Sequence, residues 1–298
     1  MRDVRTILDW FGRTLLVAGL VILGFVAYQL WGTNLLADRA QANLRSQFDS
    51  QATPTTATMP PNSTSVPTTT TTTVPSVNAP NGDAIAVIKI PRIELESTVV
   101  NGVSGADLRK GPGRYPQTVL PGEAGNAAIA GHRTTYGAPF GRLDELRVGD
   151  PIIVRTLKGT YTYRVSTEPF VVTPRQTEVL DPSPDTMLTL TTCHPKYSAA
   201  ERLIVRARLD TTTSPKPLPP SPTVPATQVV TSTTLAGAHI PVFGLVVSVL
   251  LTLLIGAGWW FLFHRRPKWT TWGIGFAVFL PALVLMYYFV ERSLPASY

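Results

Sequence analysis

The sequence predicts an all-β fold, an eight-stranded β-barrel with short helices, accompanied by three transmembrane helices. Between residues 84 and 210, short runs of β-branched and alternating apolar residues are separated by turns rich in Gly and Pro. Three long apolar segments lie outside this region, at 14–33, 239–263 and 271–290. Stretches rich in Thr, Pro and Ser separate the two kinds of region, which indicates distinct domains.

The composition favours a membrane protein over a nucleic-acid-binding protein. Hydrophobic residues make up 44% of the 298 residues and charged residues only 15%. The formal net charge of +7 is compatible with nucleic acid, but the chain has no dense Lys/Arg run and no interleaving of aromatic with basic residues. All six Trp lie in or beside the apolar segments, as in the aromatic belts of membrane proteins. We therefore expect the membrane, and no nucleic acid, among the partners.

The N-terminal segment is predicted to anchor the chain. Residues 14–31 carry no charge and are long enough to cross a hydrocarbon core of about 30 Å as a helix. The predicted organisation is a cytoplasmic N-terminus at 1–13, a transmembrane helix at 14–33 and a Thr/Pro-rich spacer at 34–82. A cleaved signal peptide is the alternative, with a candidate cleavage site at Ala40-Gln41-Ala42. Asp38 and Arg39 separate that site from the apolar run, which favours an uncleaved anchor.

The region 83–210 is predicted to fold as the barrel domain. A hairpin is expected across Lys158-Gly159, with Tyr161, Tyr163 and Val165 on one face of its second strand. Short helices are predicted at 106–110 and 140–146, and strands at 84–90, 94–100, 126–132, 151–156, 160–166, 170–172, 187–192 and 203–209. Many short strands joined by Gly/Pro turns are typical of a closed barrel, and the domain is long enough to bury a core.

Two further apolar segments follow a second Thr/Pro/Ser-rich stretch. The predicted organisation is a linker at 211–238, a transmembrane helix at 239–263, a cytoplasmic loop at 264–270, a transmembrane helix kinked at Pro281 over 271–290, and a tail at 291–298. The loop carries Arg265, Arg266 and Lys268, and each such residue costs about 2.5–3.5 kcal/mol at the centre of a membrane helix, so the loop is expected in the cytoplasm. Counting the crossings back predicts a multi-pass protein of the cell membrane with the barrel domain outside the cell.

The only cysteine, Cys193, cannot form an internal disulfide. Such a residue is either a small buried apolar residue or a nucleophile. It ends a predicted strand just before Pro195, where a rigid strand meets a loop. Because only a few per cent of an ordinary thiol is ionised at neutral pH, a reactive cysteine needs an imidazole or a guanidinium nearby.

Few residues are suited to assist this thiol. Of the four His, His239 and His264 lie at the ends of an apolar segment. His194 adjoins the cysteine, and neighbouring residues on a strand point to opposite faces. His132 also ends a predicted strand, and Arg202 begins another strand shortly after the cysteine. Taken alone, His132 is better explained as a surface histidine at the end of a strand, and Arg202 as a solvated charge.

Three ordered motifs resemble those of the sortases, the cysteine transpeptidases of Gram-positive cell surfaces. They are Ala130-Gly131-His132-Arg133, Thr189-Leu190-Thr191-Thr192-Cys193 and Arg202-Leu203-Ile204-Val205. The class E enzymes of actinobacteria are the most similar in two fuller forms, Gly111-Pro112-Gly113-Arg114-Tyr115-Pro116 and Cys193-His194-Pro195. The resemblance covers roughly residues 84–210 and implies a sortase-like β-barrel that acts as the catalytic domain.

The resemblance implies a thiol transpeptidase that needs no cofactor. It makes Cys193 the nucleophile that carries the acyl thioester, His132 the general acid/base and Arg202 the oxyanion stabiliser. Weaker candidates for substrate binding are Thr192, Tyr115 and His194. The implied substrates are secreted proteins with a C-terminal LPxTG/LAxTG-like sorting signal, cleaved between Thr and Gly and joined to a peptidoglycan-precursor amine. No metal is expected, because Asp144 and Glu145 are too sparse for a calcium site.

Two departures from the family pattern leave alternatives open. The C-terminal pair of apolar segments exceeds the single N-terminal anchor usual in class E, and pilus-polymerising sortases often carry a C-terminal anchor. Those enzymes usually have an Asp-Pro-aromatic lid, and residues 50–83 contain no Asp-Pro, which favours the housekeeping role. A non-catalytic tethered β-domain that binds the cell wall is a further hypothesis.

Overall fold

The computed structural model describes residues 2–52, 80–221, 242–263 and 269–293. The rest of the predicted spacer, linker, cytoplasmic loop and tail lies outside the described residues. The chain forms two compact units, a helical unit of Met1–Thr33 with Val230–Ala296 and a barrel unit of Asn34–Val229 with Ser297–Tyr298.

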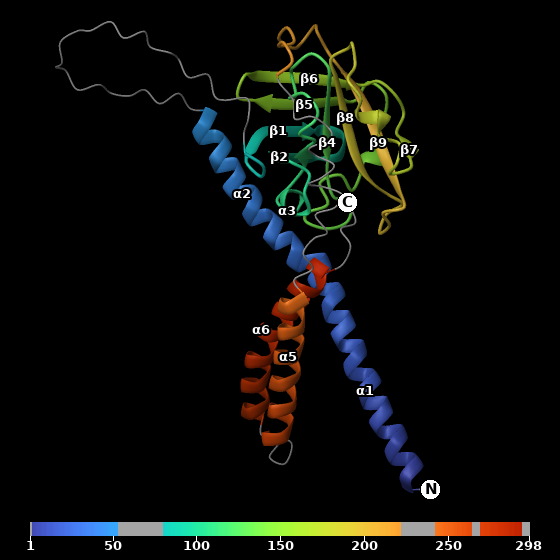
Figure 1. The fold of residues 1–298 in the computed structure, drawn as a ribbon, viewed down its shortest axis with the longest axis vertical. Coiled ribbons are helices and arrows are strands. Elements are labelled where there is room, and N and C mark those ends of the chain that lie inside the picture. Colours follow the sequence, from blue (N-terminus) through green and yellow to red (C-terminus); the bar gives the residue numbers. More distant parts are fainter. Residues whose placement is uncertain (1, 53–79, 222–241, 264–268, 294–298) are drawn as a thin grey trace, which may run out of the picture. The chain divides into compact units, whose positions relative to one another are not determined.

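The barrel unit is built on a closed ring of eight strands (Figure 1). The strands are β1 (Ala84–Ile90), β2 (Leu95–Asn101), β3 (Gly113–Arg114), β4 (Asn126–Ala130), β5 (Pro151–Thr156), β6 (Gly159–Val165), β7 (Phe170–Val172), β8 (Met187–His194) and β9 (Glu201–Leu209). They run in the order β6-β5-β1-β2-β3-β4-β8-β9, and the pairing of β6 with β9 closes the ring. The short strand β7 pairs with the first part of β9. The predicted eight-stranded β-barrel is therefore confirmed.

Most predicted elements of this unit are present, and three short ones were not predicted. All eight predicted strands are found, with ends that move by one or two residues. The predicted short helices correspond to α3 (Gly105–Leu108) and to the 3₁₀ turn η3 (Leu143–Glu145). The elements that were not predicted are β3 and the 3₁₀ turns η2 (Pro91–Ile93) and η4 (Thr177–Leu180).

The barrel interior is filled by alternate residues of its strands. On β6, Tyr161, Tyr163 and Val165 are buried in one hydrophobic cluster, as their shared face predicted. Phe140 and Leu143, from the segment around η3, are fully buried in the same cluster. Each such side chain contributes roughly 1.5–3 kcal/mol on burial, so this cluster is the main source of stability for the strands that carry the site.

Helix α2 (Thr33–Ala52) packs on the outer face of β1 and β2, beside which it lies in Figure 1. Leu44 and Phe48 of the helix form a second cluster with Ala84, Val87 and Val100. Phe48 is completely buried. The prediction of a spacer at 34–82 is therefore wrong for residues 34–52, because this segment forms a helix whose apolar face packs against the sheet.

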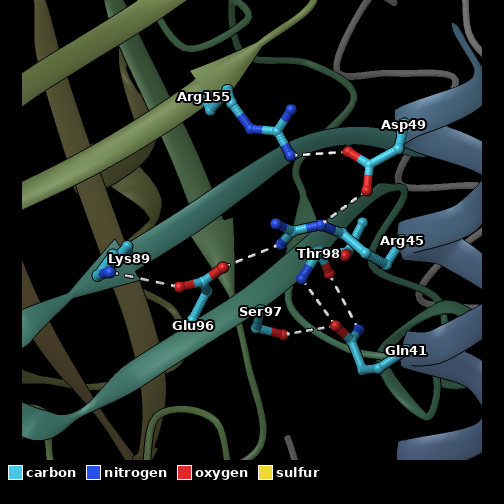
Figure 2. Close-up of polar contacts among 8 residues, drawn as sticks. All are labelled: Gln41, Arg45, Asp49, Lys89, Glu96, Ser97, Thr98 and Arg155. Atoms are coloured by element: carbon cyan, nitrogen blue, oxygen red, sulfur yellow. Dashed lines mark hydrogen bonds and ion pairs between the residues drawn. The ribbon is translucent and has the colours of Figure 1, made fainter. Parts of the chain in front are cut away.

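Gln41 fixes the helix to the sheet through both ends of its amide (Figure 2). Its Nε2 donates to Thr98 O at 3.0 Å and to Lys110 O at 2.7 Å. Its Oε1 accepts from Thr98 N at 2.7 Å and from Ser97 Oγ at 3.0 Å. The amide thus acts like a short strand edge beside β2, and this sets the position of α2 along the barrel.

Ion pairs surround the apolar contact of α2. Arg45 pairs with Glu96 and Asp49 pairs with Arg155, at 3.1 and 2.8 Å (Figure 2). The Arg155 guanidinium carbon also lies 4.8 Å from the ring centroid of Phe48. All four charged side chains are partly exposed, so the pairs contribute little stability and chiefly fix the orientation of the helix.

The chain after β9 returns to the barrel instead of leaving it at residue 211. Leu218 N donates to Gly122 O at 2.9 Å, and Ala124 N donates to Leu218 O at 2.8 Å. The Glu123 carboxylate is 1% exposed and accepts hydrogen bonds from Ser221 N and Ser221 Oγ. The predicted linker therefore begins with a segment, 211–221, that packs against the barrel.

The helical unit contains α1 (Arg2–Ala27), the π-helical turn η1 (Tyr28–Gly32), α5 (Val242–Phe263) and α6 (Trp269–Ser293). Among the described residues, one stretch, Gly273–Glu291, is both long and apolar enough to cross a bilayer. Leu15–Ala27 and Gly244–Trp259 are apolar over fewer residues than the roughly 20 that a span requires. The described residues of all three predicted transmembrane segments are helical, but within these residues the structure supports one span and not three.

Candidate active site

Cys193 lies near the end of β8, directly opposite Arg202 on β9. The two residues are partners in the antiparallel register of these strands. Directly opposed residues project to the same face of a sheet, where their side chains interact. The Cys193 side chain is buried, with 6% of the residue exposed. The register of β8 and β9 thus brings together the thiol and guanidinium that the sequence motifs singled out.

The thiol and the guanidinium lie on the outer face of the barrel wall. Leu190 on β8 and Leu203 on β9 belong to the interior cluster. Side chains alternate between the two faces, so Cys193 and Arg202 point outward. Ala130, at the end of β4, belongs to a separate cluster outside the barrel. The outer faces of β4, β8 and β9 therefore form a continuous surface around the thiol.

His132 follows β4 by two residues and comes level with Cys193. β4 and β8 run parallel, and the last residue of β4 is opposite Thr191. Gly131 N donates to Thr191 O at 3.1 Å, and Thr192 Oγ1 donates to Gly131 O at 2.8 Å. These contacts extend the pairing by one residue beyond β4. They place His132 beside the end of β8 that carries the thiol.

The His132 ring is held by the loop that follows it. Its ring centroid lies 5.1 Å from that of Tyr136, and its Nδ1 lies 3.5 Å from Thr135 Oγ1. His132 is 7% exposed. Asn34 Oδ1 of α2 accepts a hydrogen bond of 2.9 Å from Gly137 N, so the helix also supports this loop. The imidazole is consequently fixed in a dry environment.

Burial sets the protonation of the two reactive groups. It lowers the pKa of His132 to about 4, an effect to which the positive charge of Arg109 adds. Burial also raises the pKa of the Cys193 thiol above its ordinary value, and the charges of Arg202 and Arg133 oppose that rise. At neutral pH the main form is therefore a neutral imidazole beside a protonated thiol. The imidazolium–thiolate pair is a minor species.

The Arg202 side chain is anchored at the start of β9. Its Nη1 donates to Ala199 O and to Glu201 O, both at 3.0 Å. These bonds hold the guanidinium on the face of the thiol, where its charge favours the thiolate. A fixed guanidinium in this position is suited to stabilise a developing negative charge next to the sulfur.

Arg133 is a further residue at the site, and its role was not predicted from the sequence. Its Nη1 donates to Cys193 O at 3.0 Å and lies 2.8 Å from His194 Nδ1. Its Nη2 forms an ion pair of 3.2 Å with Asp144, and its side chain is only 3% exposed. The signal available in the sequence was its place directly after His132 in the first motif.

The three weaker candidates are placed differently. Thr192 faces the barrel interior, and its hydroxyl is engaged with Gly131 O. Tyr115 lies near the end of β4 on the outer face, where its Oη and Thr191 Oγ1 share a hydrogen bond of 3.2 Å. His194 projects to the face opposite Cys193 and meets Arg133. Of the three, Tyr115 lies on the face that carries the thiol.

The acidic residues near the site are engaged with arginines. Asp144 pairs with Arg133, and Glu145 pairs with Arg142 at 2.8 Å. Within the part of the chain that the structure describes, no three His, Cys, Asp or Glu side chains form a metal-binding group.

The residues of this site lie in a domain that matches a known protein family. The family model for the sortase domain matches residues 88–210, which include Cys193, His132 and Arg202. Sortase SrtE2 of Streptomyces coelicolor is 30% identical over 221 residues, covering 66% of this chain and 80% of the relative. Sortase SrtE1 of the same organism is 31% identical over 217 residues, covering 66% of this chain and 56% of the relative. The chain belongs to the sortase family, whose members are cysteine transpeptidases.

The solved structures that resemble the chain include other sortases. Sortase E from Streptomyces avermitilis is 36% identical and covers 47% of this chain and 99% of its own, with a TM-score of 0.41. A Clostridium perfringens sortase D5 transpeptidase is 35% identical and covers 44% of this chain and 82% of its own, also with a TM-score of 0.41. The match to SrtE1 spans little more than half of the length of that relative.

Proposed function

We propose that this protein is a membrane-anchored sortase of the class E type, which attaches secreted proteins to the cell wall. The observation that carries the proposal is the cross-strand pair of Cys193 and Arg202, with His132 brought level with it by the β4–β8 pairing. All three lie within the region matched by the sortase domain. The similarity to SrtE1 and SrtE2 favours class E.

The first half of the proposed reaction cleaves the sorting signal. In the minor ion-paired form, the Cys193 thiolate attacks the Thr carbonyl carbon of an LPxTG- or LAxTG-like segment, and Arg202 stabilises the oxyanion. The C–N bond to Gly then breaks, and the His132 imidazolium gives its proton to the leaving amine. The products are a thioester on Cys193, a neutral His132 and a released peptide that begins with Gly.

The second half transfers the protein to the wall. An amine of a peptidoglycan precursor attacks the thioester carbonyl and gives its proton to His132. The C–S bond breaks, and the sulfur leaves as a thiolate beside the imidazolium, which restores the starting ion pair. The net change is the exchange of one amide for another, so no oxidant, metal or nucleotide is consumed.

We propose that the barrel unit lies outside the cell and that α1, α5 and α6 all cross the membrane, although among the described residues only α6 is apolar over the length of a full span. The support is the positive charge of the loop between α5 and α6, which favours the cytoplasm. In a Cys193→Ala background, a single cysteine introduced at Ser214 should be labelled by a membrane-impermeant maleimide in intact cells. A single cysteine introduced at Lys268 should not be labelled. Labelling at Ser214 alone supports this topology, and labelling at Lys268 alone contradicts it.

The transpeptidase proposal is tested by product formation. The detergent-solubilised full-length protein is incubated with an LAxTG or LPxTG peptide and with either a peptidoglycan stem-peptide amine or a pilin-type lysine peptide. A ligated product with the stem-peptide amine that is lost in Cys193→Ala supports the wall-attachment role. A product with the lysine peptide alone supports the pilus-polymerising role. The absence of product with all pairs, together with binding to wall polymer, supports a non-catalytic module.

A further inference from the structure

We propose that Arg133 is a positioning residue for the reactive cysteine, holding the Cys193 peptide and the His194 ring while Asp144 holds the guanidinium. The inference rests on the proposed function, because it concerns the same thiol. Arg133 is a second cation near Cys193, and it lies on the side of β8 opposite Arg202.

The Arg133 side chain replaces a missing strand bond. In the parallel pair of β4 and β8, Gly131 N donates to Thr191 O. If β4 continued, the next such bond would join the main-chain N of residue 133 to Cys193 O. The chain instead turns away after His132, and the guanidinium of Arg133 donates to Cys193 O at 3.0 Å. The thiol-bearing residue therefore stays fixed although its neighbouring strand has ended.

The guanidinium of Arg133 is itself immobilised. Its two terminal nitrogens bond in different directions, to Cys193 O and His194 Nδ1 from Nη1 and to Asp144 from Nη2. The guanidinium is planar and rigid, so such bonds fix its orientation. The Arg133 side chain is 3% exposed, so it is shielded from water, whereas Asp144 at its outer end is 45% exposed. A lysine at this position would carry the charge on a single nitrogen, without the planar fork by which Arg133 reaches Cys193 O and Asp144 from two nitrogens.

The same guanidinium holds the His194 ring. A guanidinium only donates hydrogen bonds, so His194 Nδ1 at 2.8 Å is the acceptor. His194 follows Cys193 directly, so Arg133 fixes two consecutive residues at the end of β8, and its positive charge, like that of Arg202, favours the thiolate.

The test separates the charge of Arg133 from its geometry. Full-length protein in detergent is prepared as wild type, Arg133→Lys, Arg133→Gln and Asp144→Asn, with Glu145→Gln as a matched control because Glu145 pairs with Arg142 instead. The rate of Cys193 alkylation by iodoacetamide is measured against pH, together with kcat and KM for ligation. Cys193 is the only cysteine, so the alkylation reports this thiol alone.

We expect Arg133→Gln to slow alkylation at pH 7 by about threefold or more and to move its midpoint to higher pH, because the thiolate loses a neighbouring cation. Arg133→Lys should keep the alkylation midpoint but lower kcat with little change in KM, because the charge remains while the geometry is lost. Asp144→Asn should lower kcat in the same way, and Glu145→Gln should match wild type.

An unchanged alkylation profile in folded Arg133→Gln, or wild-type kcat in both Arg133→Lys and Asp144→Asn, would overturn the inference. If Arg133→Gln does not fold by circular dichroism, the Lys and Asn variants decide. Alkylation needs no peptide substrate, so a protein that makes no ligation product contradicts the proposed function while the alkylation profiles still test the role of Arg133.

Discussion

Cys193 and Arg202 are direct cross-strand partners on β8 and β9, with both side chains on the outer face of the barrel. This relationship needs no loop movement to bring the guanidinium to the thiol, because two strands of a closed ring hold it. His132 depends in contrast on a loop, which is supported by Tyr136 and by the contact of α2 at Gly137. We therefore expect the thiol–guanidinium pair to be the most rigid part of the site.

The role of Arg202 predicts a loss of rate without a loss of substrate binding. Arg202→Lys should lower kcat by on the order of 10²–10³, as the removal of one oxyanion donor does in other acyl-transfer enzymes. Arg208→Lys, on the same strand and paired with Asp185 at the surface, is the matched control and should retain wild-type kcat. Steady-state ligation kinetics provide the measurement. Equal effects of the two substitutions would argue against an oxyanion role.

The protonation states of His132 and Cys193 predict that kcat/KM varies little with pH near neutrality. Because the pKa of His132 is lowered to about 4 and that of Cys193 is raised, the neutral pair dominates between the two values. The fraction of the imidazolium–thiolate form is then independent of pH, and we expect kcat/KM to vary by less than about twofold from pH 6 to pH 8. It should fall below about pH 4, and again above the raised thiol pKa. A rise or fall of tenfold between pH 6 and pH 8 is incompatible with this assignment.

The docking of α2 predicts that this helix stabilises the barrel unit. Phe48→Ala should lower the free energy of unfolding by about 3 kcal/mol, because a fully buried ring is lost and a cavity remains. Ser46→Ala, on the exposed side of the same helix, should change it by less than about 0.5 kcal/mol. Chemical denaturation of the full-length protein measures both values, followed by circular dichroism because all six Trp lie outside the barrel strands. Similar small effects of the two substitutions would mean that α2 is only loosely attached.

The contact of Glu123 with the segment 211–221 predicts a second stabilising element. Glu123→Gln replaces one of two accepting oxygens by a donor that faces Ser221, which should cost about 1–3 kcal/mol of unfolding free energy. Glu178→Gln, at an exposed position, provides the control. A Glu123 variant as stable as the control would show that residues 211–221 do not contribute to the fold.

Much of the barrel could be predicted from the sequence because its strands alternate over several residues. Tyr161, Tyr163 and Val165 illustrate this, since a period of two is visible in any single strand. β3 has only two residues, too few to show a period. The pairing of β6 with β9, which closes the barrel, joins residues far apart in the sequence. No local pattern shows it, and it was expected only because many short strands joined by Gly/Pro turns are typical of closed barrels.

Helix α2 was missed although its pattern was present. Ala37, Gln41, Leu44 and Phe48 follow one another at spacings of four, three and four residues, and they form the face that contacts the barrel. The adjoining Thr/Pro-rich stretch and the many polar residues of the segment concealed this face. A helix with so narrow an apolar stripe is stabilised mainly by the surface on which it packs, and the sequence does not display that surface.

The candidate site was predicted unevenly for a similar reason. Cys193, His132 and Arg202 stand at strand ends and match short motifs, so they could be singled out in advance. Arg133 could not, because its role depends on where β4 ends relative to β8. That Thr192 and Cys193 face opposite sides of the sheet could be predicted from the alternation of side chains along a strand. The contact of His194 with Arg133 could not be predicted, because it depends on the folded structure.

The most direct test of the account is the intact mass of the protein after brief incubation with an LAxTG- or LPxTG-containing peptide and no amine acceptor. We predict an adduct whose mass equals the peptide up to and including Thr, attached at Cys193, removed by hydroxylamine as a thioester, and absent in Cys193→Ala. A protein whose mass remains unchanged with every such peptide, or an adduct that persists in Cys193→Ala, would contradict the central claim that this thiol is the nucleophile.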